Sequence, residues 1–421
     1  MKQRKSPAPI FKAHSRIIQR RRIVIIGAFL MFVLALTTLS ACKSTGAGKT
    51  IVPRSMAEVP SEKLAYRFEP DVPAPQDSVV SDDPNKKLEA IQAEFDSKRK
   101  DDALVRTVVS PDGKRALALY ETGQNNPGEY RVDLYKADGT FLRNITPPDF
   151  AGAFAQMAAW SPNGEHIIFA GRRTLTPKPS PTPDEPLPSD LPNPSPTPSV
   201  APLFAAVPLF NTEQIYICDQ DGFNLKPLTN REGLIYFGFD WAPDGKAITA
   251  LACKEDEWYA NAKANKPPQG RPRLIGLDAN ERLLDDGRTE AAPSWSLDGT
   301  KIATAFGTDV KIYDVGSNAP TRALISIEDS LMEASVKYDI QLDAKNKPTQ
   351  DAKATVGSNV VGTPVSFNPI VKVEWQSDNE LYLKTAFIQL DRTEPVVTFQ
   401  RWHILHLSPQ AALMGTQPPK S

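Results

Sequence analysis

The chain has 421 residues, with 49 Lys and Arg against 50 Asp and Glu. Its first 22 residues hold eight of the basic side chains and no acidic one, so the remainder carries 41 basic and 50 acidic side chains, a net charge of −9. This balance excludes bulk electrostatic attraction as a means of binding nucleic acid or an anionic membrane face.

The N-terminal region has the pattern of an export signal, predicted to end at residue 41. An almost uninterrupted apolar run from Ile23 to Leu39 follows the basic residues, and this order is typical of a segment whose basic end stays in the cytoplasm. The run ends in Leu-Ser-Ala-Cys at residues 39–42, which resembles the lipobox of bacterial lipoproteins. The resemblance implies that Cys42 becomes an acylated mature N-terminus on the bacterial cell envelope. Lys43 in place of an aspartate favours the outer membrane by analogy. The alternative is an uncleaved signal anchor, since the run is nearly long enough to span a bilayer.

Residues 42–102 are predicted to be a tether that contains two ordered pieces. Leu88, Ile91 and Phe95 have the spacing of one short amphipathic helix. Leu64 to Phe68 could form a single strand.

A turn motif then recurs through residues 103–408. It consists of an aromatic or apolar residue, a Ser-Pro-Asp-Gly-like turn and an apolar strand, and the last copy is degraded. Proline presets φ at the first turn position, Asp or Asn binds its own backbone, and glycine takes positive φ. The residues that carry the motif are Pro111, Asp112, Gly113, Trp160, Pro162, Gly164, Trp241, Pro243, Asp244, Gly245, Trp295, Asp298, Gly299 and Trp375.

In a complete repeat one strand-like segment precedes the turn and three follow it, so the repeat predicts four antiparallel strands, which we call A, B, C and D. Repeats of about 50 residues with this content indicate the blades of a β-propeller. The pattern resembles the TolB-type or WD40-like PD40 propeller family over roughly residues 104–407. That resemblance implies the fold and transfers little function, because the family's functions are diverse. The four motif tryptophans are expected to pack between neighbouring blades.

Five repeats are readable, and we predict six blades. The fifth repeat lacks a strand D before the chain ends, and an open edge invites aggregation. We therefore expect a segment before Leu104, with Leu64 to Phe68 as the candidate, to complete the last blade. A sixth repeat could lie within residues 326–370, where Ala334 to Leu342 alternates like a strand. Residues 409–421 are expected to be a disordered tail.

Strand direction divides the predicted fold into two faces. The A–B and C–D turns share one end of each blade, which we call the plain face; the B–C loops and the connections between blades share the other, which we call the elaborated face. Three insertions fall on the elaborated face: the Pro-rich segment 174–208, predicted to be disordered, residues 253–270, and residues 326–370. Because function concentrates on loops held by a rigid scaffold, we expect a partner to bind there.

Signals of catalysis and metal binding are weak. There is no Gly-x-Ser-x-Gly elbow. His403 and His406 are three apart and would point to opposite sides of a strand, and residues 219–224 suit a turn better than a calcium loop. Cys218 and Cys253 could form one disulfide or remain two buried thiols. Trp258 and Tyr259, in an insertion, could stack on carbohydrate.

The sequence therefore predicts a lipid-anchored envelope protein that is a non-catalytic, protein-binding propeller without a metal or cofactor. An envelope hydrolase or lyase with its site in the propeller funnel is the alternative. The expected partners are another envelope protein and the membrane, through Cys42.

Overall fold

The computed structural model describes residues 56–75, 87–122, 129–154, 157–173, 207–316, 322–336, 368–388 and 397–408. The signal region, Cys42, most of the Pro-rich insertion and the C-terminal tail lie outside these residues. Among the described residues, no helix combines the length and the apolar character needed to cross a membrane.

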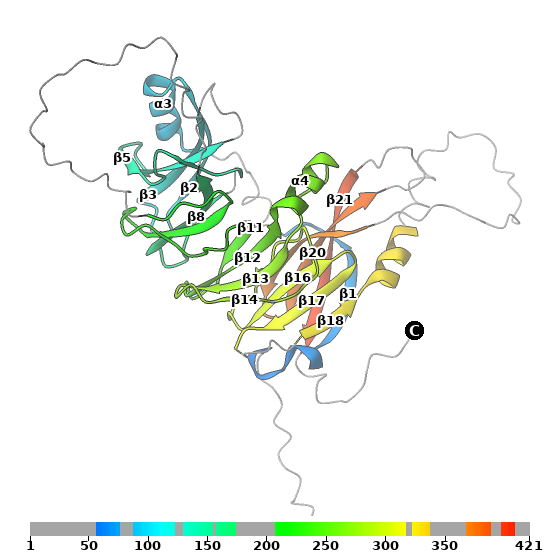
Figure 1. Ribbon diagram of the computed structural model, residues 1–421. Helices are drawn as coiled ribbons and strands as arrows, with labels where there is room; N and C mark the ends of the chain where they lie inside the picture. The colour runs from blue at the N-terminus through cyan, green and yellow to red at the C-terminus, as the bar shows by residue number, and fades with distance from the viewer. Residues whose placement is uncertain are drawn as a thin grey trace, which may run out of the picture. The chain divides into compact units, whose positions relative to one another are not determined.

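Antiparallel strands in five sheets make up most of the described chain (Figure 1). Sheet 1 contains β2 (Asp102–Val109), β3 (Arg115–Thr122), β4 (Tyr130–Lys136) and β5 (Phe141–Asn144). Sheet 2 contains β6 (Phe150–Ala151), β7 (Ala158–Trp160), β8 (His166–Arg173), β9 (Gln214–Asp219) and β10 (Lys226–Pro227). Sheet 3 contains β11 (Leu234–Trp241), β12 (Ala247–Lys254), β13 (Arg271–Gly276) and β14 (Glu281–Leu283). Sheet 4 contains β15 (Ser294–Trp295), β16 (Lys301–Phe306), β17 (Asp309–Asp314) and β18 (Arg322–Ser326).

Sheet 5 joins the two ends of the described chain. It contains β19 (Ile370–Ser377), β20 (Glu380–Ile388), β21 (Val397–Ser408) and, as its outer strand, β1 (Ala65–Val72). β1 pairs antiparallel with β21, with Ala65 opposite Ser408 and Phe68 opposite Leu405. An N-terminal strand thus occupies the strand D position that the fifth repeat leaves open, and it covers an edge that would otherwise be unpaired.

The turn motif has the local geometry that its residues predict. Gly113, Gly164, Gly245 and Gly299 all have φ near +70°, which suits glycine because it has no Cβ. In the first copy the Ser110 hydroxyl donates to Asp112 (2.6 Å), and the Asp112 carboxylate accepts from the Lys114 backbone N–H (3.1 Å). This hydrogen bonding lowers the pKa of Asp112. The motif therefore fixes the register between strands A and B through local contacts.

The motif tryptophans are buried between consecutive sheets. Trp160 donates from Nε1 to the carbonyl of Val108 in sheet 1 (2.9 Å). Trp241 packs with residues of sheet 2, Trp295 packs with residues of sheet 3, and Trp375 packs with residues of sheet 4. These contacts, together with those between the first strands of neighbouring sheets (β2 with β7, β11 with β15, β15 with β19), place the sheets side by side in chain order.

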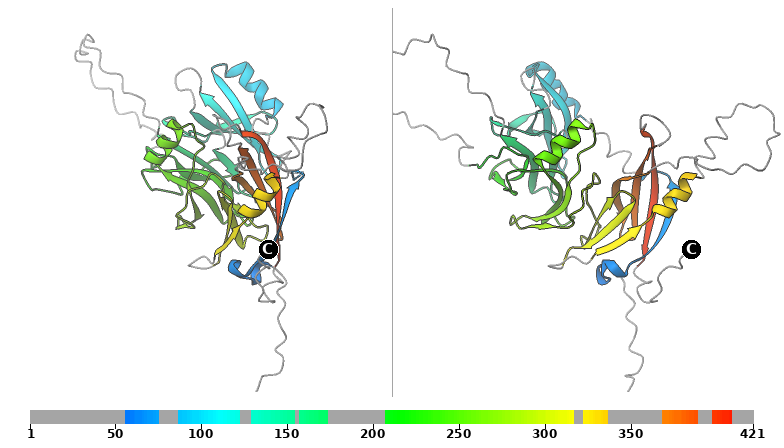
Figure 2. Two further views of the ribbon diagram at one scale, coloured as in Figure 1. Left: turned by 90° about the vertical axis from the view of Figure 1, so that its right-hand side faces the viewer. Right: turned by 45° about the vertical axis from the view of Figure 1, so that its right-hand side comes forward.

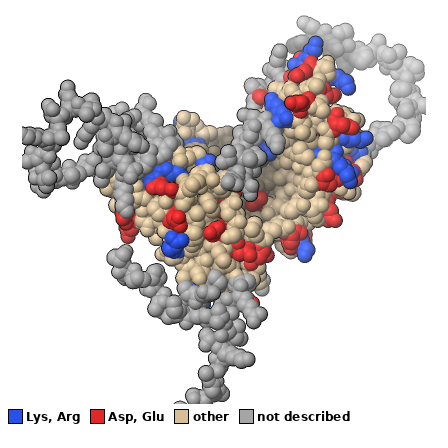
Figure 3. All heavy atoms as spheres, turned by 180° about the vertical axis from the view of Figure 1, so that it is seen from behind, with Lys and Arg blue, Asp and Glu red and all other residues tan. Residues whose placement is uncertain are grey.

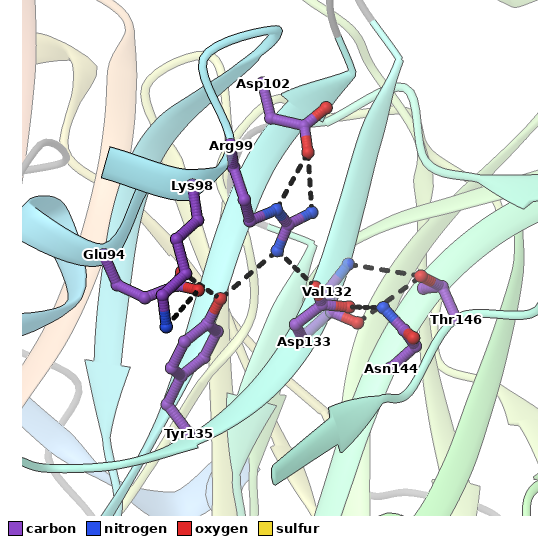
Figure 4. A network of polar contacts seen from close by, with 9 residues as sticks. All are labelled: Glu94, Lys98, Arg99, Asp102, Val132, Asp133, Tyr135, Asn144 and Thr146. Carbon is purple, nitrogen blue, oxygen red and sulfur yellow. Dashed lines mark hydrogen bonds and ion pairs between the residues drawn. The ribbon is translucent and has the colours of Figure 1, made fainter. Parts of the chain in front are cut away.

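A helix covers the side of sheet 1 that faces away from sheet 2. This helix is α3 (Glu89–Lys98), and its Ile91 and Phe95 are buried against Tyr120 and Tyr135. Just after the helix, Arg99 donates to Asp102 (2.7 Å), to the buried Asp133 (2.6 Å) and to Tyr135 (3.2 Å) (Figure 4). Part of the predicted tether is therefore packed against the body of the fold, and the views of Figure 2 show α3 lying along sheet 1.

The predicted fold class, all-β with four-stranded antiparallel blades, is confirmed, whereas six blades remain a prediction. The strand expected to begin at Ala334 is wrong for its first residues, because residues 328–336 are helical. Leu331, Ala334 and Ser335 are buried at helical spacing, so tertiary burial selected a helix where a few alternating residues suggested a strand. Residues 337–342 lie outside the described part.

Candidate functional site

The two ends of the sheets differ as the strand order predicts. At the plain face, the A–B turns of sheets 1 to 4 are tight Ser- or Ala-led turns closed by glycine. At the elaborated face, sheet 3 carries α4 (Glu255–Lys263) in its B–C loop, and residues 328–336 form a helix directly after β18 (Figure 1).

The α4 helix is anchored at its first turn by one carboxylate. Glu257 accepts the backbone N–H of Lys254 (3.0 Å) and binds Arg271 with both oxygens, each at 2.8 Å. The Arg271 bonds lower the pKa of Glu257 to about 2. Such a paired, bidentate arrangement holds the loop in one position rather than offering a reactive group.

A pocket of about 710 Å³ opens beside this helix on the elaborated face. It is built from the B–C loop of sheet 3, the connection from sheet 3 to sheet 4, and the loop ends of sheets 4 and 5. Apolar side chains line part of the pocket, and charged and amide side chains line the rest. The lining residues are Lys266, Pro267, Gln269, Arg288, Thr289, Glu290, Gly307, Pro369, Ile370, Val371, Ala386 and Gln400.

The polar and charged side chains of this pocket differ in their exposure and in their bonding partners. Lys266 is exposed, whereas Glu290 is half-buried and burial raises its pKa. Arg288 lies 3.7 Å from Glu257 at the edge of the pocket. The Thr289 hydroxyl donates a hydrogen bond to the Ala305 carbonyl and accepts one from the Ala291 N–H. The pocket therefore combines an ammonium and a carboxyl group with apolar lining residues.

A second set of charges lies on the first strands of sheets 3 and 5. The Asp240 side chain on β11 is solvent-exposed, yet desolvation by the surrounding protein, followed by the charge of Glu374 on β19, raises its pKa to about 6. Glu374 lies 3.2 Å from Lys372 and accepts from Gln376 (2.6 Å). The first strands of sheets 3 and 5 thus each contribute a carboxyl group to this set of charges.

A third cluster lies at the B–C end of sheet 2, where the Pro-rich insertion begins. Arg172 donates to the buried Glu213 (3.1 Å) and lies 3.4 Å from Glu129 of the neighbouring sheet. The second oxygen of Glu213 is buried without a hydrogen-bond partner among the described residues. The cluster ties the ends of two sheets together at the base of the insertion.

The remaining residues singled out in the sequence have structural partners. Cys218 and Cys253 are buried free thiols rather than a disulfide. His403 contacts Thr385 and Asp71, whereas His406 contacts Glu69 and Glu380, so the two histidines face different surroundings. Within the described ranges, no group of three or more His, Cys, Asp and Glu side chains could hold a metal ion.

The loop at residues 219–224 and the aromatic pair on α4 are also accounted for. Asp219 accepts the backbone N–H groups of Asp221 and Phe223, which closes the turn predicted there. Trp258 packs edge-on against Phe154 and is only partly available, while the ring of Tyr259 is 62% exposed.

The division into two faces follows from the sequence, whereas the residues that line the pocket do not. They come from loops of three sheets, and none belongs to a recognisable motif. The described part of the surface shown in Figure 3 carries interspersed acidic and basic side chains and no continuous basic patch.

Comparisons with known proteins identify no family. No family model matches the chain, and no curated protein matches it. Similar solved structures include an oligogalacturonate lyase from Vibrio parahaemolyticus, with 8% identity over 72% of this chain and 65% of that one and a TM-score of 0.37. A TolB-type protein from Agrobacterium tumefaciens has 12% identity over 72% of this chain and 88% of that one, with a TM-score of 0.31. Prolyl oligopeptidase B from Galerina marginata has 10% identity over 84% of this chain and 40% of that one, with a TM-score of 0.39. The chain thus spans less than two thirds of the lyase and of the peptidase, and these likenesses carry no conclusion about activity.

Proposed function

We propose that this protein is a lipid-anchored envelope protein whose propeller binds another protein through its elaborated face. The observation that carries the proposal is the pocket formed where the loops of sheets 3, 4 and 5 meet, next to the helix α4. Its apolar lining residues offer area that a partner can cover, and its charged side chains offer specificity. The plain face has tight turns in the corresponding positions and a smaller pocket, of about 420 Å³, beside the N-terminal turns.

The anchoring part of the proposal rests on Cys42 and the apolar run before it. Acyl chains contribute about 0.8 kcal/mol per buried CH₂, so several chains on one cysteine hold a protein to a membrane durably. Labelling with a radioactive or clickable fatty acid tests this directly, and a Cys42→Ala variant should lose the label.

Affinity capture from solubilised membranes tests the binding part. The bait is the full-length acylated protein, and two charge-reversal variants are compared with it. Lys266→Glu changes the pocket wall, whereas Lys246→Glu makes the same change at an exposed lysine of a plain-face turn. We expect the protein captured by the wild type to be lost with Lys266→Glu and kept with Lys246→Glu. Equal capture by all three baits would overturn the assignment of the site.

An enzymatic function is the second candidate, and one observation favours it. Desolvation, followed by the charge of Glu374, raises the pKa of Asp240 to about 6. A carboxyl group whose pKa lies this close to neutral is suited to general acid–base catalysis. Turnover of envelope glycans or peptides that disappears in an Asp240→Asn variant would support the enzyme over the scaffold.

A further inference from the structure

The first described residues are fastened to one end of sheet 4. Two 3₁₀ turns, Met56–Glu58 and Ser61–Lys63, precede β1. Met56 is buried in the core shared by sheets 4 and 5. The second turn contacts β17 and β18.

A buried lysine holds this segment in place. Lys301 is 1% exposed, and its ammonium group donates to the Val59 carbonyl (2.8 Å) and to Asp314 (2.6 Å). The same carboxylate accepts from the backbone N–H (3.0 Å) and the hydroxyl (2.8 Å) of Ser61. A buried ammonium is tolerated only when its hydrogen bonds are made, so the segment and the sheet end hold each other in a single arrangement.

This fastening lies at the plain face. Lys301 is the first residue after the A–B turn of sheet 4, and Asp314 is the last before the C–D turn. β1 then starts at the same end, with Ala65 opposite Ser408, and runs toward the elaborated face. Figure 1 shows the blue N-terminal turns at the ends of β17 and β18 and α4 at the opposite end of its sheet.

We infer that the plain face is turned toward the membrane and that the elaborated face points away from it. This inference rests on the proposed anchoring at Cys42. Only 13 residues lie between Cys42 and the buried Met56, and the 14 residue-to-residue steps that join them reach at most about 50 Å whatever the conformation.

The orientation restricts the partner. Strand β12 has eight residues, which corresponds to about 26 Å between the two faces. In the inferred orientation the pocket and α4 lie about that much farther from the bilayer than the fastened segment does. The partner that fits this placement is a protein that approaches from the aqueous side rather than one embedded in the same bilayer.

Energy transfer from single labels to the bilayer tests the orientation. Leu297→Cys places a donor dye on the plain face, where the native side chain is 57% exposed, and Tyr259→Cys places one on the elaborated face at a site 62% exposed. The native Cys218 and Cys253 are buried, and burial raises the pKa of both thiols, so they stay unlabelled. The acylated full-length protein is reconstituted into phosphatidylcholine vesicles that carry an acceptor dye on lipid headgroups.

We expect transfer from position 297 to be at least twofold more efficient than from position 259. An Asp314→Asn variant, in which the fastening is weakened, should reduce that difference. If the protein floats with the vesicles and position 259 transfers as well as or better than position 297, the orientation is overturned while the anchoring stands. If the wild type fails to float and incorporates no fatty acid, the anchoring itself is overturned, and the orientation falls with it.

Discussion

Removing the Asp314 carboxylate is the sharpest test of how the N-terminal segment is held. In an Asp314→Ala variant the buried ammonium of Lys301 keeps, among the described residues, only the Val59 carbonyl as a partner, and Ser61 loses the acceptor of both its donors. Breaking a buried ion pair by removing one partner typically costs about 3–5 kcal/mol, because the remaining charge stays buried and uncompensated. We expect the free energy of unfolding to fall by about that amount.

The companion variants separate charge from packing. Lys301→Met removes the buried cation and leaves Asp314, which is 18% exposed, bonded to Ser61. We therefore expect it to cost about 1–2 kcal/mol, less than Asp314→Ala. The double variant should be more stable than Asp314→Ala alone, because it contains no unpaired buried charge.

Urea denaturation followed by tryptophan fluorescence measures these differences, with limited proteolysis near residues 56–64 as an independent readout. An Asp314→Ala variant within about 1 kcal/mol of the wild type would refute the reasoning. So would a double variant that is no more stable than Asp314→Ala.

Three further changes have distinct expected outcomes. Trp160→Phe should destabilise the fold by about 1–2 kcal/mol more than Trp241→Phe. The reason is that the Trp160 indole donates to the Val108 carbonyl, whereas the Trp241 Nε1 is buried without an acceptor among the described residues. Burial lowers the pKa of His403 from 6.5 to about 4, so the histidine is protonated in the unfolded chain at a pH at which it is still neutral in the folded protein. The free energy of unfolding should therefore fall by about 3 kcal/mol as the pH drops from about 6.5 to 4. His403→Gln should remove this pH dependence when unfolding is measured across that range. The pKa of Asp240 is raised to about 6, so its protonated form stabilises the fold fully below about pH 3.8, and this stabilisation is lost as the pH rises through 6. Asp240→Asn should therefore raise the thermal midpoint, relative to the wild type, more at pH 7.5 than at pH 4.5.

Each of these expectations has a result that contradicts it. Equal losses in the two tryptophan variants would mean that the indole hydrogen bond adds nothing to packing. An unchanged slope in His403→Gln would assign the acid sensitivity to other groups. A midpoint difference for Asp240→Asn that is the same at both pH values would show that the carboxyl titrates normally.

The neutral state of His403 has a specific structural cause. Its Nδ1 accepts the backbone N–H of Asp71 (3.1 Å), so the ring proton lies on Nε2 and is donated to the Thr385 hydroxyl (3.0 Å). Protonating Nδ1 would break its hydrogen bond to Asp71 in β1. The strand β1 is also held by two 2.7 Å hydrogen bonds from Arg401 to the Asp71 carboxylate. Acid is therefore expected to loosen the strand that completes sheet 5.

The sequence by itself determined the repeating unit of this protein. Ser-Pro-Asp-Gly is a contiguous turn whose hydrogen bonds and positive φ involve neighbouring residues only, so it is readable without tertiary information. The order of strands A to D, the division into two faces, and the need for an N-terminal strand beside β21 all follow from that unit.

Only the tertiary structure decided what lies between the repeats. Lys301 and Val59 are 242 residues apart, and nothing in either segment indicates the other. The influence of Glu374 on Asp240, and the pocket drawn from loops of three sheets, likewise depend on how separate sheets converge. Residues 328–336 formed a helix because burial of Leu331, Ala334 and Ser335 outweighed a short alternating pattern. Local turn chemistry is thus encoded in contiguous residues, whereas charge pairing and burial between distant segments exist only once the chain has folded.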